Sequence, residues 1–261
     1  MYEIAGRGFP AGFTIEPHTD NCRRICAEGG HALVGVSPGN GYFSEERLSH
    51  LLRWAGTAFD RVDAIIPDAS LVHTHRALGE PPERALRKAA AESARTRRRV
   101  ERAWQAIGVP PREQRVHLLS EFTDHPTYRA LRRDAEEAVR RDAAVREVFR
   151  HAGAAALRTR LKGAEPAAHQ VEEAMNYLVA EMPLCTDTPG ILGVPTSVNV
   201  YHQVIPAISL LFASRALYVS PGQAFALVRP AVPEAVPEAV PAGPRPARDL
   251  RLVPAAGEAG R

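Results

Sequence analysis

The clearest chemical candidate in the sequence is Ser37, which follows a short apolar segment and begins a turn-rich loop. Residues 31–36 (HALVGV) are typical of a buried strand, and residues 38–41 (PGNG) follow the serine. Gly35 would let a substrate approach the backbone closely, and Asn40 offers an amide to a substrate oxygen. Ser37 is therefore a candidate nucleophile at the mouth of a sheet, although a strand-to-loop serine without chemistry fits the same residues.

The pentapeptide 35–39 (GVSPG) also matches the G-x-S-x-G nucleophile elbow of α/β-hydrolases. In that elbow the residue after the serine donates its backbone N–H to an oxyanion, and Pro38 has no N–H. The elbow also follows a central strand, whereas we predict that Ser37 follows the first strand. No HGGG-type loop precedes it. A serine hydrolase is thus an alternative that rests on the pentapeptide alone.

A second group of candidates lies in a later helix and strand. Tyr177 and Glu181 are four residues apart in a helical segment (MNYLVAEMPL), which places the phenol and the carboxylate on one face. A carboxylate there could hold an α-amino group or take a proton from it. Tyr201 and His202 end a predicted strand, where a tyrosine can relay protons and a histidine can be acid, base or structural. Taken alone, these residues are better explained as a surface glutamate, a buried tyrosine and a structural histidine.

A third candidate feature is a basic face on a helix predicted over 83–107. Eight basic residues stand against two glutamates between positions 84 and 102, while Val100, Trp104 and Ile107 mark the core-facing side. Charge runs are usually solvated faces, but arginine pairs bidentately with phosphate, so this face is also a candidate for binding a nucleic-acid backbone. A non-catalytic RNA-binding module is therefore a second alternative. The residues near this face are Arg84, Lys88, Arg95, Arg98, Arg99 and Arg102.

The elements that must position these residues alternate along the chain. Such alternation predicts a parallel sheet with helices on both faces, a Rossmann-like α/β domain whose ligands bind beyond the carboxyl ends of the strands. Ser37 and Ser120 fall at such ends. We predict strands over 31–36, 62–67, 115–120 and 197–201, helices over 45–59, 83–107, 126–161 (broken near Gly153) and 168–181 (ended by Pro183), and a further apolar segment over 205–217.

Composition indicates a soluble cytoplasmic protein. Of 261 residues 45% are hydrophobic, enough for one sizeable core, and the net charge of +3 does not by itself imply nucleic acid. The three cysteines show no disulfide-like pattern, and Cys22 and Cys26 lack a second pair of ligands, so no metal site is expected. No signal peptide and no apolar run long enough to cross a bilayer is visible, so no membrane partner is expected.

The chain is predicted to hold one catalytic domain over 1–228 and a tail over 229–261. The tail is rich in proline and alanine, includes the tandem AVPEAVPEAVPAG, and has almost no large aromatic or periodic apolar content. It cannot offset its ordering entropy by burial, so we predict that it is disordered.

Several separated blocks together resemble the tRNA-dependent cyclodipeptide synthases. The blocks are HALVGVSPGNGYFS at 31–44, Tyr128, NYLVAEMPL at 176–184 and SVNVYH at 197–202, within about residues 30–215. The resemblance implies a Rossmann-like fold similar to the catalytic domain of class I tyrosyl- and tryptophanyl-tRNA synthetases. It also implies an aminoacyltransferase that consumes two aminoacyl-tRNAs and releases a cyclic dipeptide, a 2,5-diketopiperazine.

The resemblance assigns a role to each candidate. Ser37 would form an aminoacyl-enzyme and then a dipeptidyl-enzyme, Tyr177 and Glu181 would hold the amino group, and Tyr201 would assist the cyclisation. The basic helix would contact tRNA. Asn40, Tyr201 and His202 match the subgroup named for asparagine, tyrosine and histidine. The supporting residues would be Gly35, Asn40, Tyr128 and His202, and the first aminoacyl pocket would be lined by Leu33, Gly35, Leu119 and Leu184.

No cofactor is expected from this reading. An aminoacyl-tRNA ester is already activated, so ATP is not required. The chain lacks the H-x-G-H signature of class I synthetases, and its two isolated lysines, Lys88 and Lys162, cannot form a K-M-S-K-S loop. We expect a monomer that needs no nucleotide and no metal. The pocket residues favour an uncharged hydrophobic first amino acid such as Leu, Phe or Met, and leave the second open.

Overall fold

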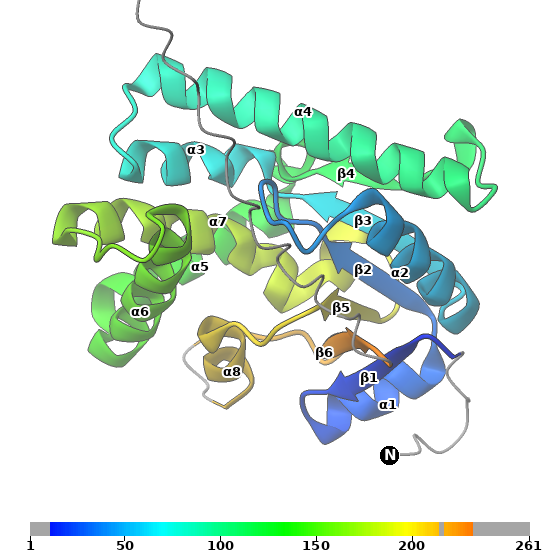
Figure 1. Ribbon diagram of the computed structural model, residues 1–261. Helices are drawn as coiled ribbons and strands as arrows, with labels where there is room; N and C mark the ends of the chain where they lie inside the picture. Colours follow the sequence, from blue (N-terminus) through cyan, green and yellow to red (C-terminus); the bar gives the residue numbers. More distant parts are fainter. Residues whose placement is uncertain (1–10, 214–216, 232–261) are drawn as a thin grey trace, which may run out of the picture.

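The computed structural model describes residues 11–213 and 217–231 and is built around one six-stranded sheet (Figure 1). The strand order across the sheet is β1-β6-β5-β2-β3-β4. The strands are β1 (Phe13–Pro17), β2 (His31–Gly35), β3 (Arg61–Ile66), β4 (Val116–Leu118), β5 (Ser197–Tyr201) and β6 (Gln223–Pro230).

The predicted parallel sheet is correct for the strands from β6 to β4 and wrong for the edge strand β1. β5 pairs in parallel with β2 and with β6, whereas β1 runs antiparallel to β6. An antiparallel edge strand is common on an otherwise parallel sheet. Neither β1 nor β6 was expected, and β2 is consequently not the first strand. It lies inside the sheet, between β5 and β3.

Helices cover both faces of the sheet, as predicted. On one face, α1, α2 and α4 pack over Ala32 and Val34 of β2 and their neighbours in β3, β5 and β6. On the other face, α7 lies against β5 and β6 and packs against α3, α5 and α6, while α8 packs against α6. The helices are α1 (Asp20–Glu28), α2 (Glu45–Ala58), α3 (Asp68–Ala77), α4 (Pro82–Ala106), α5 (Pro126–Arg141), α6 (Ala143–Arg160), α7 (Ala168–Leu192) and α8 (Pro206–Ala213), with short 3-10 turns η1 (Pro111–Glu113) and η2 (Leu119–Phe122).

Two predicted helix boundaries are wrong. The helix expected over 126–161 breaks at Asp142, whose side chain caps α6 by accepting from the Ala144 N–H at 2.8 Å, and not near Gly153, which is buried inside α6. α7 also continues through Pro183 and bends only at Asp187. Met182, Pro183 and Leu184 are all buried. Their packing outweighs the one backbone hydrogen bond that proline removes.

The end of the sheet lies beyond the predicted domain boundary. β6 pairs with β1 as far as Pro230, opposite Phe13, so the first residues assigned to the tail belong to the sheet. Residues 232–261, and with them the rest of the predicted tail, lie outside the described residues. Among the described helices, none has the length and apolar character needed to span a membrane.

Candidate active site

Ser37 lies directly after β2 and contacts the end of the neighbouring strand β5. Its Oγ is 2.9 Å from the phenol oxygen of Tyr201. The two residues meet because β2 and β5 are adjacent and parallel, so their carboxyl ends reach the same edge of the sheet. A Cβ on Gly35 would lie 3.5 Å from the Tyr201 ring, in van der Waals contact, so Gly35 sits directly beside the phenol ring. The serine, the tyrosine and the glycine thus form one unit.

Tyr177 and Glu181 complete this unit from α7. The two side chains lie close enough to shift each other's pKa, and Ser37 also lowers the pKa of Tyr177. Burial raises the pKa of Glu181 to about 7, against the opposing effect of the Tyr177 hydrogen bond. Burial likewise raises the pKa of both tyrosines, so their phenols stay neutral near pH 7. The site therefore holds a serine, two neutral phenols and one carboxyl group that titrates near neutrality.

Asn40 and His202 also meet, and they organise the loop after the serine. The Asn40 amide nitrogen is 3.2 Å from His202 Nε2, and the Asn40 side-chain oxygen accepts from the Tyr42 N–H at 2.9 Å. The Tyr42 ring stacks on His202 with centroids 3.9 Å apart. Burial, together with Arg47, lowers the pKa of His202 to about 4, so this imidazole is neutral and acts as a support. Tyr42 was missed because a stacking partner distant in sequence leaves no local signal.

Three of the four residues expected to line the first aminoacyl pocket, all but Gly35, lie in one buried apolar cluster. Leu33 from β2, Leu119 from η2 and Leu184 from α7 all belong to it. Tyr128 belongs to it as well, and its phenol donates to the Ala180 carbonyl at 2.7 Å, immediately before Glu181. Tyr128 thus fixes α7 at the carboxylate. Asn199, which the sequence did not single out, pairs in register with Leu33 and donates to the Leu184 carbonyl at 2.8 Å.

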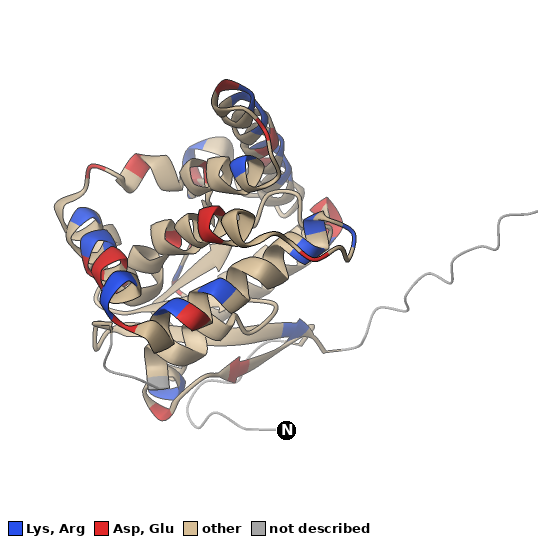
Figure 2. Cartoon of the chain, turned by 90° about the vertical axis from the view of Figure 1, so that its left-hand side faces the viewer, with Lys and Arg blue, Asp and Glu red and all other residues tan. Residues whose placement is uncertain are grey.

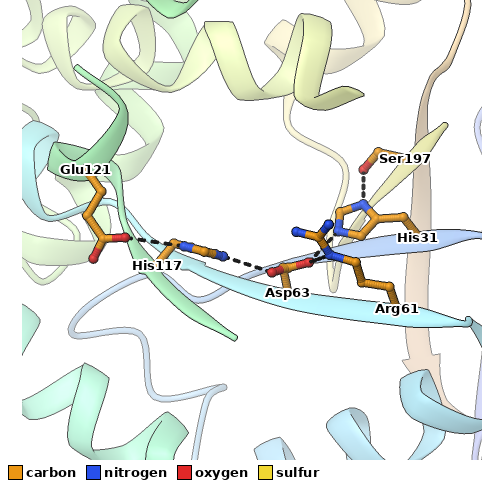
Figure 3. A network of polar contacts seen from close by, with 6 residues as sticks. All are labelled: His31, Arg61, Asp63, His117, Glu121 and Ser197. Atoms are coloured by element: carbon orange, nitrogen blue, oxygen red, sulfur yellow. Dashed lines mark hydrogen bonds and ion pairs between the residues drawn. The ribbon is translucent and has the colours of Figure 1, made fainter. Parts of the chain in front are cut away.

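A buried polar network lies on the sheet beside this cluster (Figure 3). The Asp63 carboxylate is fully buried in β3 next to Leu33, and it accepts from His31 at 2.9 Å and from Arg61 at 2.6 Å. His117 of β4 binds its other oxygen at 2.8 Å. Burial alone would raise the pKa of Asp63, but these three partners outweigh burial and hold the pKa well below its usual range. The network fixes the strands that carry the pocket residues.

The basic face of α4 borders the loop that carries Ser37. Arg99 donates to the Phe43 carbonyl at 3.0 Å, and Arg102 pairs with Glu45 at 2.6 Å. Arg84 and Lys88 both pair with Glu80. Arg95 and Arg98 are exposed and make no ion pair within the described part of the chain. The helix therefore places two uncommitted guanidinium groups on the surface near the candidate nucleophile loop.

The charges of α5 and α6 are arranged differently. Figure 2 shows basic and acidic segments interleaved along the helices on the side that it presents. Arg132 pairs with Glu136 at 3.0 Å, Arg146 with Glu172 at 2.9 Å, and Arg140 with Glu137. These pairs neutralise part of the charge, and this surface carries both signs.

The geometry at Ser37 does not match a serine hydrolase. Within residues 11–213 and 217–231 the Ser37 hydroxyl hydrogen-bonds to the Tyr201 phenol, and the nearby His202 contacts Asn40 instead. The expectation that Ser37 follows the first strand is wrong: it follows the central strand β2, as an elbow serine would. Two differences from a serine hydrolase remain. Among the described residues the Ser37 hydroxyl has no imidazole partner, and Pro38 has no backbone N–H. In the same residue ranges, no group of three or more His, Cys, Asp or Glu side chains could hold a metal ion.

Comparison with known proteins gives a consistent result. The family model described as cyclodipeptide synthase matches residues 13–230. A cyclo(L-tyrosyl-L-tyrosyl) synthase from Mycobacterium tuberculosis is 37% identical over 84% of this chain and 76% of its own length. A cyclo(L-leucyl-L-phenylalanyl) synthase from Streptomyces noursei is 34% identical over 81% of this chain and 89% of its own.

Solved structures agree with these sequence matches. A Mycobacterium tuberculosis protein, whose structure relates cyclodipeptide synthetases to type I tRNA synthetases, superimposes with a TM-score of 0.74 at 36% identity, covering 86% of this chain and 98% of that one. A solved cyclo(L-leucyl-L-phenylalanyl) synthase gives a TM-score of 0.71 at 32% identity, over 85% of this chain and 100% of that one. The matched region runs from β1 to β6 and includes every residue of the candidate site, and the chain therefore belongs to the cyclodipeptide synthase family.

Proposed function

We propose that this chain makes a cyclic dipeptide from two aminoacyl-tRNAs, through esters on Ser37 and without ATP. The observation that carries the proposal is the 2.9 Å contact between Ser37 Oγ and the Tyr201 phenol, with Tyr177 and Glu181 of α7 beside it. This arrangement offers a nucleophile, a neutral proton relay and a carboxylate for an amino group. Those are the groups that two successive ester aminolyses require.

The first step is an ester exchange at Ser37. Its Oγ attacks the carbonyl carbon of the first aminoacyl-tRNA, and the bond from that carbon to the terminal ribose oxygen breaks. The serine proton passes through the Tyr201 phenol to the departing ribose oxygen. One ester is exchanged for another, so the bond energy is conserved and no adenylate is needed.

The next two steps form the amide bonds. The bound α-ammonium group must lose a proton before it attacks the ester of the second aminoacyl-tRNA. Its ordinary pKa is about 7.7–8.0, close to that of Glu181 at about 7, so the carboxylate can accept that proton at little cost. The bond from that ester carbonyl to the second ribose oxygen breaks, the oxygen takes up a proton released by the amine, and a dipeptidyl ester remains on Ser37. Its terminal amine then attacks the Ser37 ester, which closes the ring, and Ser37 Oγ recovers a proton through Tyr201.

The residues proposed to line the first aminoacyl pocket indicate the chemical class of the first amino acid. Leu33, Leu119 and Leu184 lie together and are buried, which favours an uncharged hydrophobic side chain. The relatives compared above are named for tyrosyl, leucyl and phenylalanyl products, which are all of this kind. We propose that the first residue is Leu, Phe, Met or Tyr, and a product made only of charged amino acids would refute this.

The proposal is tested with the enzyme and total charged tRNA, followed by mass spectrometry of the small products and of the protein. Wild type should release a cyclic dipeptide and carry an aminoacyl mass on Ser37. Ser37→Ala removes only the hydroxyl, so it should fold normally and lose both signals. Cyclic dipeptide from the alanine variant at a near wild-type rate would overturn the assignment of Ser37.

The same experiment separates the alternatives. A serine hydrolase would cleave simple esters and ignore charged tRNA. An RNA-binding module would bind tRNA without an aminoacyl adduct. Either outcome for the wild-type protein would refute the synthase.

A further inference from the structure

Gly39, two residues after Ser37, packs against an ion pair between α4 and α6. Gly39 has a φ of +71°, and a Cβ on it would collide with the Glu92 carboxylate of α4 and lie within 2.9 Å of both terminal nitrogens of Arg160 from α6. Only glycine fits both the conformation and the space. The loop and the ion pair are therefore in direct contact two residues from Ser37.

Arg160 also holds the loop through a hydrogen bond. Its Nη2 donates to the Pro38 carbonyl at 2.9 Å and to Glu92 Oε1 at 2.9 Å. Pro38 has no N–H, so this carbonyl is the hydrogen-bonding group that its backbone offers. It belongs to the residue bonded to Ser37. A shift of this carbonyl therefore moves the serine.

The second oxygen of Glu92 faces a third helix. His75 Nε2 of α3 lies 3.2 Å from Glu92 Oε2. Only 12% of the Glu92 side chain and 29% of the Arg160 side chain are exposed. The pair is thus largely enclosed, and it joins α4 and the end of α6 to the loop.

We propose that Arg160, fixed by Glu92, is a positioning residue that sets the direction of the Ser37 hydroxyl. Because Glu92 belongs to the same helix as the exposed Arg95 and Arg98, the pair also connects the loop to the helix proposed to receive tRNA. This inference rests on the proposed function and adds to it a group that does not touch the reacting atoms.

A direct phosphate contact is the rival role for Arg160. Its guanidinium is already shared between the Pro38 carbonyl and Glu92, which argues against that role. Arg158, two residues earlier in α6, pairs with the exposed Glu165 at 2.8 Å and makes no hydrogen bond to the loop among the described residues. Arg158 therefore serves as a matched control on the same helix end.

The test measures single-turnover formation of the Ser37 ester from charged tRNA, together with tRNA affinity and thermal midpoint. Arg160→Met should lower the acylation rate at saturating tRNA by about tenfold to a hundredfold, since small misplacements of reacting groups have effects of this order. The dissociation constant for tRNA should not change. Arg160→Lys keeps the positive charge but lacks the forked N–H donors of the guanidinium group, so its acylation rate should be intermediate. Arg158→Met should acylate like wild type.

A double variant tests whether Glu92 acts through Arg160. Glu92→Gln should slow acylation, and Glu92→Gln combined with Arg160→Met should be no slower than Arg160→Met alone, because the two residues form one unit. If Arg160→Met does not fold, Arg160→Lys and Glu92→Gln give the same comparison.

Two results would overturn the inference. One is a wild-type acylation rate in Arg160→Met. The other is a loss confined to tRNA affinity with a shallower salt dependence, which would make Arg160 a phosphate contact. Neither result affects the proposed function as long as the wild-type protein forms the Ser37 ester. If the wild-type protein does not form this ester, the proposed function itself is refuted.

Discussion

Single residues in this molecule show how partners decide the charge of a buried carboxyl group. Glu181 and Asp63 are both enclosed, and burial raises the pKa of each. Glu181 has one phenol as a partner, so burial prevails and its pKa is about 7. Asp63 is bound by Arg61 and two histidines, so their hydrogen bonds prevail and its pKa falls. The first group is suited to proton transfer at neutral pH, and the second to holding structure.

Glu181→Gln tests the role of the first carboxylate. The substitution keeps the size and removes the base, so formation of the dipeptidyl-enzyme should slow by about tenfold or more, given that a hydrogen bond to a charged group contributes roughly 1.5–3 kcal/mol. The Ser37 ester should still form. Rapid-quench mass spectrometry of the two protein adducts distinguishes these steps. An unchanged turnover rate would show that Glu181 takes no part in the reaction.

The pH dependence of the wild-type reaction follows from the same group. Since the pKa of Glu181 is raised to about 7, its basic form is lost as the pH falls below 7. The rate of amide formation should therefore rise through pH 7 in wild type. If the rate of amide formation still rises with pH in Glu181→Gln, that remaining pH dependence comes from the α-amino group of the substrate.

At the scale of elements, α4 combines a buried face with an exposed basic face. Ala89, Thr96 and Val100 are buried on one side, and Arg95 and Arg98 are exposed on the other. The sequence spacing predicts these two faces, because side chains three or four apart share a side of a helix. It does not predict that Arg99 and Arg102 bind the segment after Ser37, which depends on how α4 packs on α2.

Neutralising the uncommitted arginines tests tRNA binding by α4. Arg95→Gln with Arg98→Gln should weaken all aminoacyl-tRNAs alike, because backbone contacts carry little sequence information. The salt slope of binding should fall by roughly 0.7–0.9 per lost contact. Titrations at several salt concentrations measure both. Arg140→Gln with Arg141→Gln on α5 is the matched control, and equal behaviour of the two double variants would exclude docking through this face.

The network around Asp63 makes a prediction about stability. Asp63→Asn leaves Arg61, His31 and His117 facing a neutral amide, so the free energy of unfolding should fall by about 3 kcal/mol, as for other broken buried pairs. Urea denaturation near pH 6 measures it. A loss below about 1 kcal/mol would mean that the network contributes little to the fold.

The pH range of this effect follows from the directions of the pKa shifts. Asp63 has a lowered pKa, so its contribution is complete above its ordinary value of 3.8 and is lost as the pH falls toward the folded-state value. Its hydrogen bond raises the pKa of His117, so that contribution is complete below 6.5 and is lost as the pH rises through the folded-state value. The difference between wild type and Asp63→Asn should therefore be largest between pH 3.8 and 6.5.

At the scale of the whole molecule, the family match and the sheet end together. The match covers 13–230, and β6 ends at Pro230. The residues beyond 231 lie outside this match, so deleting 232–261 should leave the rate of cyclic dipeptide formation within about twofold of wild type and the thermal midpoint unchanged. A large loss of either would show that the synthase needs the C-terminal residues.

The sequence by itself determined the family, the candidate nucleophile and much of the architecture. Ser37 with its glycine-bracketed loop, the pair Tyr177 and Glu181, and Tyr201 at a strand end are each contained in a few consecutive residues. The start of α2 is equally local, because the Ser44 side chain accepts from the Arg47 N–H three residues later. Patterns of this kind depend only on residues a few positions apart, so they can be recognised in the sequence alone.

Only the tertiary structure decided which of these pieces meet. The contacts from Ser37 to Tyr201, from Asn40 to His202 and from Arg160 to Pro38 each join residues more than 100 positions apart. The antiparallel place of β1 beside β6 and the continuation of α7 through Pro183 also depend on such partners. Long-range packing supplies the free energy that overrides local preference, so no local pattern could have revealed them.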